Sequence, residues 1–93
     1  MNQLLLSAHV QERGAKRYTP AGLPALDLRL QSESTVSQNG QSRKVSLELR
    51  AVVIGNLVSV VERFDLGSLA TFAGFLAPSR NGKGLVFHIT ELH

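Results

Sequence analysis

The chain has 93 residues, of which 43% are hydrophobic and 18% charged, so it can form one compact domain but is too short for two. It has no cysteine, which excludes disulfide bonds, thiolate metal sites and a cysteine nucleophile. The formal net charge of +3 permits a polyanionic partner without requiring one. The first residues carry no signal-peptide or membrane-span pattern, so we expect a soluble, cytoplasmic protein with residues 1–93 as a single domain.

Apolar and polar residues alternate in the first third of the chain, which indicates strands with one buried face. The alternation covers residues 4–10 and returns over residues 26–31. Between them, residues 15–24 contain the stretch TPAGLP, with two prolines and a glycine. Because proline holds φ and glycine tolerates sharp turns, we expect a stiff loop that loses little entropy when Arg17 and Tyr18 meet a ligand.

The middle of the chain predicts a hairpin. Residues 33–44 form a polar connection, in which Asn39-Gly40 is a turn signal because both residue types tolerate positive φ. The third strand follows over residues 45–53.

The last third of the chain predicts a helix and two more strands. Apolar residues recur with helical spacing over residues 55–64, where Asn56 is a suitable N-cap. A strand that is apolar on both faces follows over residues 69–75. A second Asn-Gly loop over residues 78–84 then leads into a final strand over residues 85–92.

Five strands with a helix between the third and the fourth are the element order of an OB-fold. We therefore predict an all-β fold, a five-stranded OB-fold barrel with a short helix between strands 3 and 4. An open sheet covered by one helix is the alternative. Gly74, inside the fourth strand, predicts a bend or bulge of the kind that turns a barrel corner.

Seven of the ten basic residues lie in or beside three connections between the predicted strands. In an OB-fold the loops after strands one and four flank the face that binds oligonucleotides. The pattern favours a nucleic-acid backbone as the ligand, although simple exposure of loop charges to water explains it about equally well. The seven are Arg13, Lys16, Arg17, Arg43, Lys44, Arg80 and Lys83.

Aromatic residues, which single-strand binders use to stack bases, are scarce in this chain. It has four phenylalanines, one tyrosine and no tryptophan. Phe64, Phe72 and Phe75 lie among apolar residues and are predicted to be core, whereas Phe87 could lie on either strand face. Tyr18 is the candidate for stacking, or else packs its ring over the barrel end. We therefore expect electrostatics to carry most of the binding, which makes it weak and salt-sensitive.

No combination of residues indicates catalysis. The three histidines lie on separate segments, and no hydrolase, nucleotide-binding or metalloprotease motif occurs. Asp27 and Glu48 project from strand faces that also carry Arg29 and Arg50, which favours cross-strand ion pairs over a catalytic pair. We expect a non-enzymatic protein without a metal or cofactor.

The chain resembles the primosomal replication protein N family, the restart-primosome relatives of bacterial single-stranded DNA-binding protein. The match runs from NQLLLSAHV through RYTPAGLPALDLRLQSES and RAVVIG to GSLATFAGFLAPSRNGKG and FHITEL, and covers nearly the whole chain. The resemblance implies an OB-fold homodimer that binds single-stranded DNA without sequence preference. It also implies contact with a replication-restart helicase and other primosome proteins, and no enzymatic activity.

By position, the resemblance carries DNA-contacting roles onto basic residues of this chain. Family members with strong binding have an aromatic residue on the strand-three face, where this chain has Ser46. The edge of strand one around Leu5 is a candidate dimer seam, since an edge strand needs a partner or a cover. A protein–protein adaptor with incidental DNA binding remains the alternative function. The basic candidates are Arg17, Arg43, Arg80 and Lys83, followed by Lys16, Arg29 and Lys44.

Overall fold

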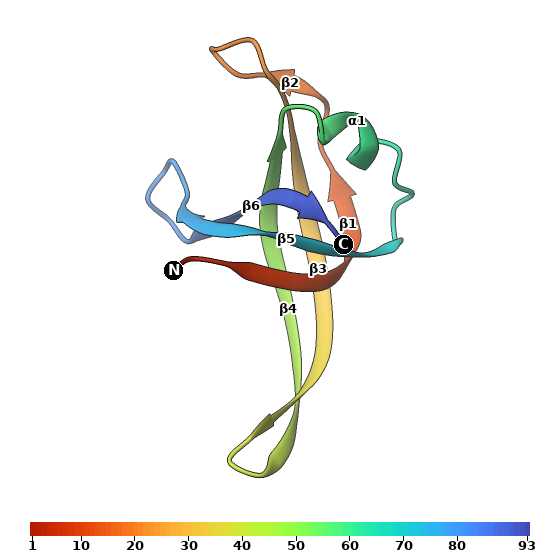
Figure 1. Ribbon diagram of the computed structural model, residues 1–93, viewed down its shortest axis with the longest axis vertical. Coiled ribbons are helices and arrows are strands. Elements are labelled where there is room, and N and C mark those ends of the chain that lie inside the picture. The colour runs from red at the N-terminus through yellow and green to blue at the C-terminus, as the bar shows by residue number, and fades with distance from the viewer.

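The computed structural model describes all 93 residues as a closed β-barrel with one long projecting hairpin (Figure 1). Strands β3 and β4 pair with each other, β3 also pairs with β1, and β1 pairs with β5. The ring closes because β6 pairs with β5 and, in parallel, with β4. The predicted five-stranded OB-fold barrel is therefore confirmed. The elements are β1 (Leu4–Arg13), β2 (Arg17–Tyr18), β3 (Pro24–Gln38), β4 (Gln41–Ile54), α1 (Val58–Val61), β5 (Leu69–Pro78) and β6 (Leu85–Leu92).

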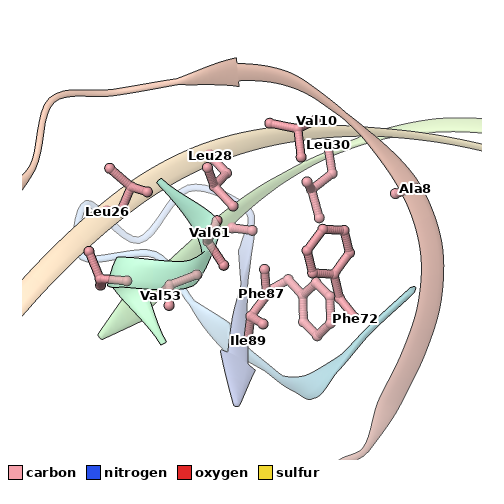
Figure 2. Packing of buried hydrophobic residues seen from close by; sticks show 12 residues of the cluster. Ala8, Val10, Leu26, Leu28, Leu30, Val53, Val61, Phe72, Phe87 and Ile89 are labelled. Atoms are coloured by element: carbon pink, nitrogen blue, oxygen red, sulfur yellow. The ribbon is translucent and has the colours of Figure 1, made fainter. Parts of the chain in front are cut away.

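Alternate residues of every barrel strand point inward and build one apolar core (Figure 2). Phe72 of β5 and Phe87 of β6 are its largest side chains, and both are fully buried. Val58 and Val61 of α1 pack against the same cluster. The helix between β4 and β5 therefore contributes its apolar face to the barrel core.

The predicted long hairpin is present as β3 and β4, but its two strands extend further than predicted. Residues 33–44, expected to be a polar connection, continue both strands up to the pair Gln38–Gln41. Only Asn39 and Gly40 form the turn, with φ angles of 53° and 75° as the predicted turn requires. The hairpin projects beyond the barrel, where both faces meet water, so its strands need no apolar side (Figure 1). Polar composition therefore did not reveal the strand ends.

The helix is shorter than the predicted segment 55–64. It covers Val58–Val61, and Leu57 rather than the expected Asn56 is the N-cap, without a side-chain cap hydrogen bond. β-Branched valines restrict their side chains in a helix, which disfavours a longer one. The turn is held instead by burial of Val58 and Val61. No helix of this structure has the length and apolar character needed to cross a membrane.

The TPAGLP stretch forms a tight hairpin between β2 and β3. The amide of Gly22 donates to the Thr19 carbonyl at 2.8 Å, and the Thr19 amide donates to the Leu23 carbonyl at 2.8 Å. Gly22 has a φ of 84°, which only glycine adopts at low cost. The two residues of β2 then pair with the start of β3, Arg17 opposite Ala25. The stiff turn therefore fixes the residues that immediately precede it.

The register between β5 and β6 shifts at Gly74, where a bend or bulge was predicted. Ala73 faces Glu91, but the next residue, Gly74, faces Ile89, so β6 has one residue more than β5 at this point. As a consequence, Phe75 lies opposite His88. Phe75 is 38% exposed, so its prediction as a core residue was wrong. It is three residues from Phe72 on one strand, and the two rings therefore point to opposite faces.

Candidate nucleic-acid interface

A groove of about 380 Å³ crosses the outer face of the barrel between the β2–β3 hairpin and the loop that joins β5 to β6. Its floor is formed by the neighbouring strands β4 and β6, which pair Val52 with His88. In OB-folds the face of the second and third barrel strands, here β3 and β4, binds oligonucleotides together with these two loops, so the groove shares β4 and both loops with that region. The lining residues are Arg17, Thr19 and Asp27 on one side, Pro78, Ser79, Arg80 and Asn81 on the other, and Arg50, Val52, Ile54, Val86 and His88 between them.

Arg17 is held in the groove by a two-pronged contact with Asp27. Its Nε and Nη2 donate to the two carboxylate oxygens at 2.9 and 3.0 Å. The hydrogen bond, and with it the attraction between the charges, raises the pKa of the Arg17 guanidinium above its usual value. The arginine therefore stays charged, but Asp27 offsets part of the field that a ligand phosphate would meet.

Arg50 is a groove residue that the sequence analysis did not include among the candidates. It was expected to pair with acidic residues of the neighbouring strand, but it has no carboxylate partner. The acidic residues of these strands pair with other arginines: Glu48 contacts Arg29 at 3.6 Å, and Asp27 pairs with Arg17. Arg50 instead lies opposite Arg29 and donates to the backbone carbonyl of Lys83 at 3.3 Å. Arg50 therefore has no carboxylate within ion-pair distance on the groove floor.

The loop after β5 is ordered by its own hydrogen bonds. The Ser79 hydroxyl donates to the Lys83 carbonyl at 2.7 Å, and the Asn81 side-chain oxygen accepts from the Lys83 amide at 2.9 Å. Arg80 lines the groove opposite Arg17. Neither Arg80 nor Lys83 has a carboxylate partner, so both side chains are available to an anionic ligand.

The other predicted basic residues lie outside this groove. Lys16 contacts Glu62 at 3.7 Å beyond α1, and Arg29 lies between Glu48 and Glu12. Arg43 and Lys44 are on the projecting part of β4 and not in a loop beside the barrel. By strand alternation Lys44 shares the face of Arg50, whereas Arg43 points to the opposite face. The structure thus brings together two of the predicted residues, Arg17 and Arg80, and separates Arg43 from them.

Tyr18 is next to Arg17 on β2 and lies in the open. Its side chain does not belong to the core cluster, and the residue is 64% exposed. The Tyr18 ring is therefore not packed over the end of the barrel, which was the alternative prediction. The exposed ring stays a candidate for contact with a base.

An OB-fold barrel with basic loops on either side of one strand face defines the oligonucleotide-binding class of this fold. Comparison with known proteins narrows that class. Residues 2–91 match a family model described as another single-strand binding protein family. Replication restart protein PriB of Bordetella pertussis is 50% identical over 80 residues, which are 86% of this chain and 75% of that protein. PriB of Neisseria gonorrhoeae is 40% identical over 76 residues, 82% of this chain and 75% of the relative.

Solved structures agree with the sequence matches. PriB from Ralstonia solanacearum superposes with a TM-score of 0.91 at 36% identity, over 100% of this chain and 96% of its own. The single-stranded DNA binding protein from Thermus aquaticus superposes with a TM-score of 0.76 at 25% identity, over 100% of this chain and 49% of its own. The chain belongs to the PriB family of replication restart proteins.

Proposed function

We propose that this chain is a non-enzymatic single-stranded DNA-binding protein of replication restart, which holds the DNA backbone in the groove between β2 and the β5–β6 loop. The observation that carries the proposal is that Arg17, Arg50 and Arg80, from three separate segments, line one groove. Guanidinium groups suit phosphate because their planar donors can form paired hydrogen bonds. Backbone contacts do not depend on base sequence, which accords with binding without sequence preference.

The remaining basic candidates are proposed as outer contacts. Lys83 adjoins the groove through its hydrogen bond with Arg50, and Lys44 lies further along the same face of β4. Arg43 would meet only DNA that wraps around the hairpin. Glu48 pairs with Arg29 on the strand face between them, so the path from groove to hairpin is less basic than the groove itself.

The test is the salt dependence of oligonucleotide binding by the double variant Arg50→Ala/Arg80→Ala. Each lost phosphate contact removes about 0.7 from the log–log slope, so the slope should flatten by about 1.4 and affinity near 0.1 M salt should fall about twentyfold. Fluorescence anisotropy of a labelled oligo-dT at four salt concentrations measures both. Arg63→Ala controls for the loss of one positive charge away from the site, since Arg63 is exposed and lies outside the groove. A slope equal to that of the wild type would remove these arginines from the site.

Asp27→Asn is expected to tighten DNA binding about fivefold near 0.1 M salt, because Arg17 gains a phosphate in place of the carboxylate it now contacts. The slope should then steepen by about 0.7. Asp65→Asn changes the net charge equally but lies outside the groove, so it controls for the overall field. The same titration decides, and equal effects of the two variants would show that the Asp27–Arg17 pair does not compete with DNA.

Homodimer formation is also proposed. Strand β1 pairs with β3 only from His9 onward, so one edge of its first half has no partner strand. Leu5 on this half is 64% exposed, which suits a seam between two copies. Contact with a helicase and other primosome proteins in the cytoplasm rests on the family resemblance.

The adaptor function is favoured by one observation, the polar outer face of β4, the third strand of the predicted barrel. There Gln31 of β3 donates to the Ser46 hydroxyl at 2.9 Å, and no aromatic ring is present at Ser46. Titration of the wild type with oligo-dT at near-physiological salt separates the two functions. Saturable binding supports the DNA-binding proposal, and its absence supports the adaptor.

A further inference from the structure

Two aromatic rings are stacked on the outside of the barrel, next to the groove. Phe75 of β5 and His88 of β6 have ring centroids 4.8 Å apart and planes 4° apart. They are direct cross-strand partners because of the register shift at Gly74. Each ring therefore fixes the plane of the other, and neither contributes to the buried core cluster.

The stack joins the basic groove to an apolar hollow. A hollow of about 290 Å³ is lined by Val52, Ile54, Leu57, Phe75, His88, Ile89 and Thr90. His88, Val52 and Ile54 also line the groove that contains the three arginines. Ile54 is 43% exposed, so the boundary between the two hollows is open and apolar. A ligand in the groove would thus meet charge on one side and a flat ring with aliphatic neighbours on the other.

We infer that His88, backed by Phe75, is a base-stacking residue of the DNA site: one nucleobase lies in the apolar hollow while the adjoining phosphates contact Arg50 and Arg80. This inference rests on the proposed function and adds to it the position of a base. Histidine is among the side chains on which unpaired bases stack. A ring already held in plane by a second ring loses little freedom when a base is added.

The inference also accounts for the absence of an aromatic residue at Ser46 of β4, the third strand of the predicted barrel. At Ser46 of β4 the outer face carries a hydroxyl that accepts from the Gln31 amide of β3, and these polar groups form no stacking platform. The groove floor further along β4 is apolar at Val52 and Ile54, and β6 places His88 beside Val52. In this chain the stacking surface would therefore be formed by β5 and β6 instead of by β4.

The test compares two oligonucleotides of equal length, one of thymidines and one of abasic sugar–phosphate units. His88→Ala should weaken binding of oligo-dT about tenfold, the usual order for one lost base stack, and leave binding of the abasic strand unchanged. His88→Phe keeps a flat ring and should retain wild-type affinity for both. Phe75→Leu removes the backing ring and should weaken only oligo-dT. His93→Ala is the control for loss of a histidine outside the groove.

The outcomes separate this inference from the proposed function. If His88→Ala lost affinity equally for oligo-dT and for the abasic oligonucleotide, His88 would be a backbone contact. If it lost affinity for neither, the stack would be a surface for another partner. Either result overturns the inference. If Arg50→Ala/Arg80→Ala still flattens the salt slope, the proposed function survives either result. If the wild type binds neither strand, both proposals fail. Thermal unfolding of each variant shows whether it is folded, and only folded variants are compared. Phe75→Leu tests the stack by a second substitution if His88→Ala does not fold.

Discussion

Gly74→Ala is expected to lower the free energy of unfolding by about 3 kcal/mol or more, the upper range for overpacking. A Cβ atom built at this position lies 1.8 Å from the carbonyl oxygen of His88 and 2.8 Å from its carbonyl carbon. Both atoms belong to the backbone, so no side chain can rotate away. The clash can be relieved only if β5 and β6 separate where their register shifts. For a domain of this size such a loss would lower Tm by about 15 °C.

Gly14→Ala is the matched control for this substitution. Its Cβ would meet Asp27 atoms at 3.6 and 3.8 Å, which is ordinary contact, and Gly14 does not have a positive φ. We expect its unfolding free energy to stay within about 0.5 kcal/mol of the wild type. Urea denaturation at one fixed protein concentration compares the two, since a dimer would make stability concentration-dependent. Equal stabilities would mean that the β5–β6 bulge accommodates a methyl group, contrary to its geometry.

The barrel could be predicted from the sequence because its interior faces repeat every second residue and its connections carry two Asn-Gly signals and the TPAGLP stretch. The bulge at Gly74 was predictable on a separate ground, because a glycine inside an apolar strand implies close backbone approach. The projecting hairpin was not predictable from periodicity. Beyond the barrel no face is buried, and alternation vanishes even though the backbone ladder continues to Gln38 and Gln41.

The candidate site could be predicted in part. Charge in the first and last loops predicted the two sides of the groove, at Arg17 and Arg80. Arg50 was missed because strand arginines were assigned to ion pairs without a register. Counting back from a two-residue Asn39-Gly40 turn would have set Arg50 opposite Arg29 and Glu48 opposite Gln31, as the structure does. Arg50 is thereby opposite a like charge and has no carboxylate facing it directly.

The choice of ion-pair partners among the arginines and carboxylates depends on tertiary contacts that the periodicity of the sequence does not reveal. Asp27 is occupied by Arg17 only because the TPAGLP turn folds β2 back along β3. Arg29 contacts Glu12 because the register shift in β1 between Val10 and Glu12 places Glu12 directly opposite Arg29. These pairs leave the net charge of +3 unchanged, because each joins one cation to one anion, but they neutralise several basic side chains locally. The uncompensated charge that remains on the groove is therefore more local than the loop composition suggested.

Phe72→Ala is expected to cost about 3–5 kcal/mol, the range for removing a fully buried aromatic ring. Phe72 has no exposed surface and packs with the tilted ring of Phe64 at a centroid distance of 6.3 Å. Because β5 is paired with strands on both edges, the cavity cannot collapse by moving one strand alone. The midpoint of urea denaturation should fall, with an unchanged m-value if unfolding stays cooperative.

Phe75→Ala is the internal comparison, since it removes the same ring from the same strand on the opposite face. It loses the stack with His88, which is worth about 1 kcal/mol, and creates no buried cavity. The two variants should therefore have opposite consequences for stability and binding. Phe72→Ala lowers stability and leaves the DNA affinity of folded protein unchanged, whereas Phe75→Ala lowers affinity for oligo-dT with little loss of stability. If Phe75→Ala proved as destabilising as Phe72→Ala, the ring would belong to a buried interface and not to an open face of the barrel.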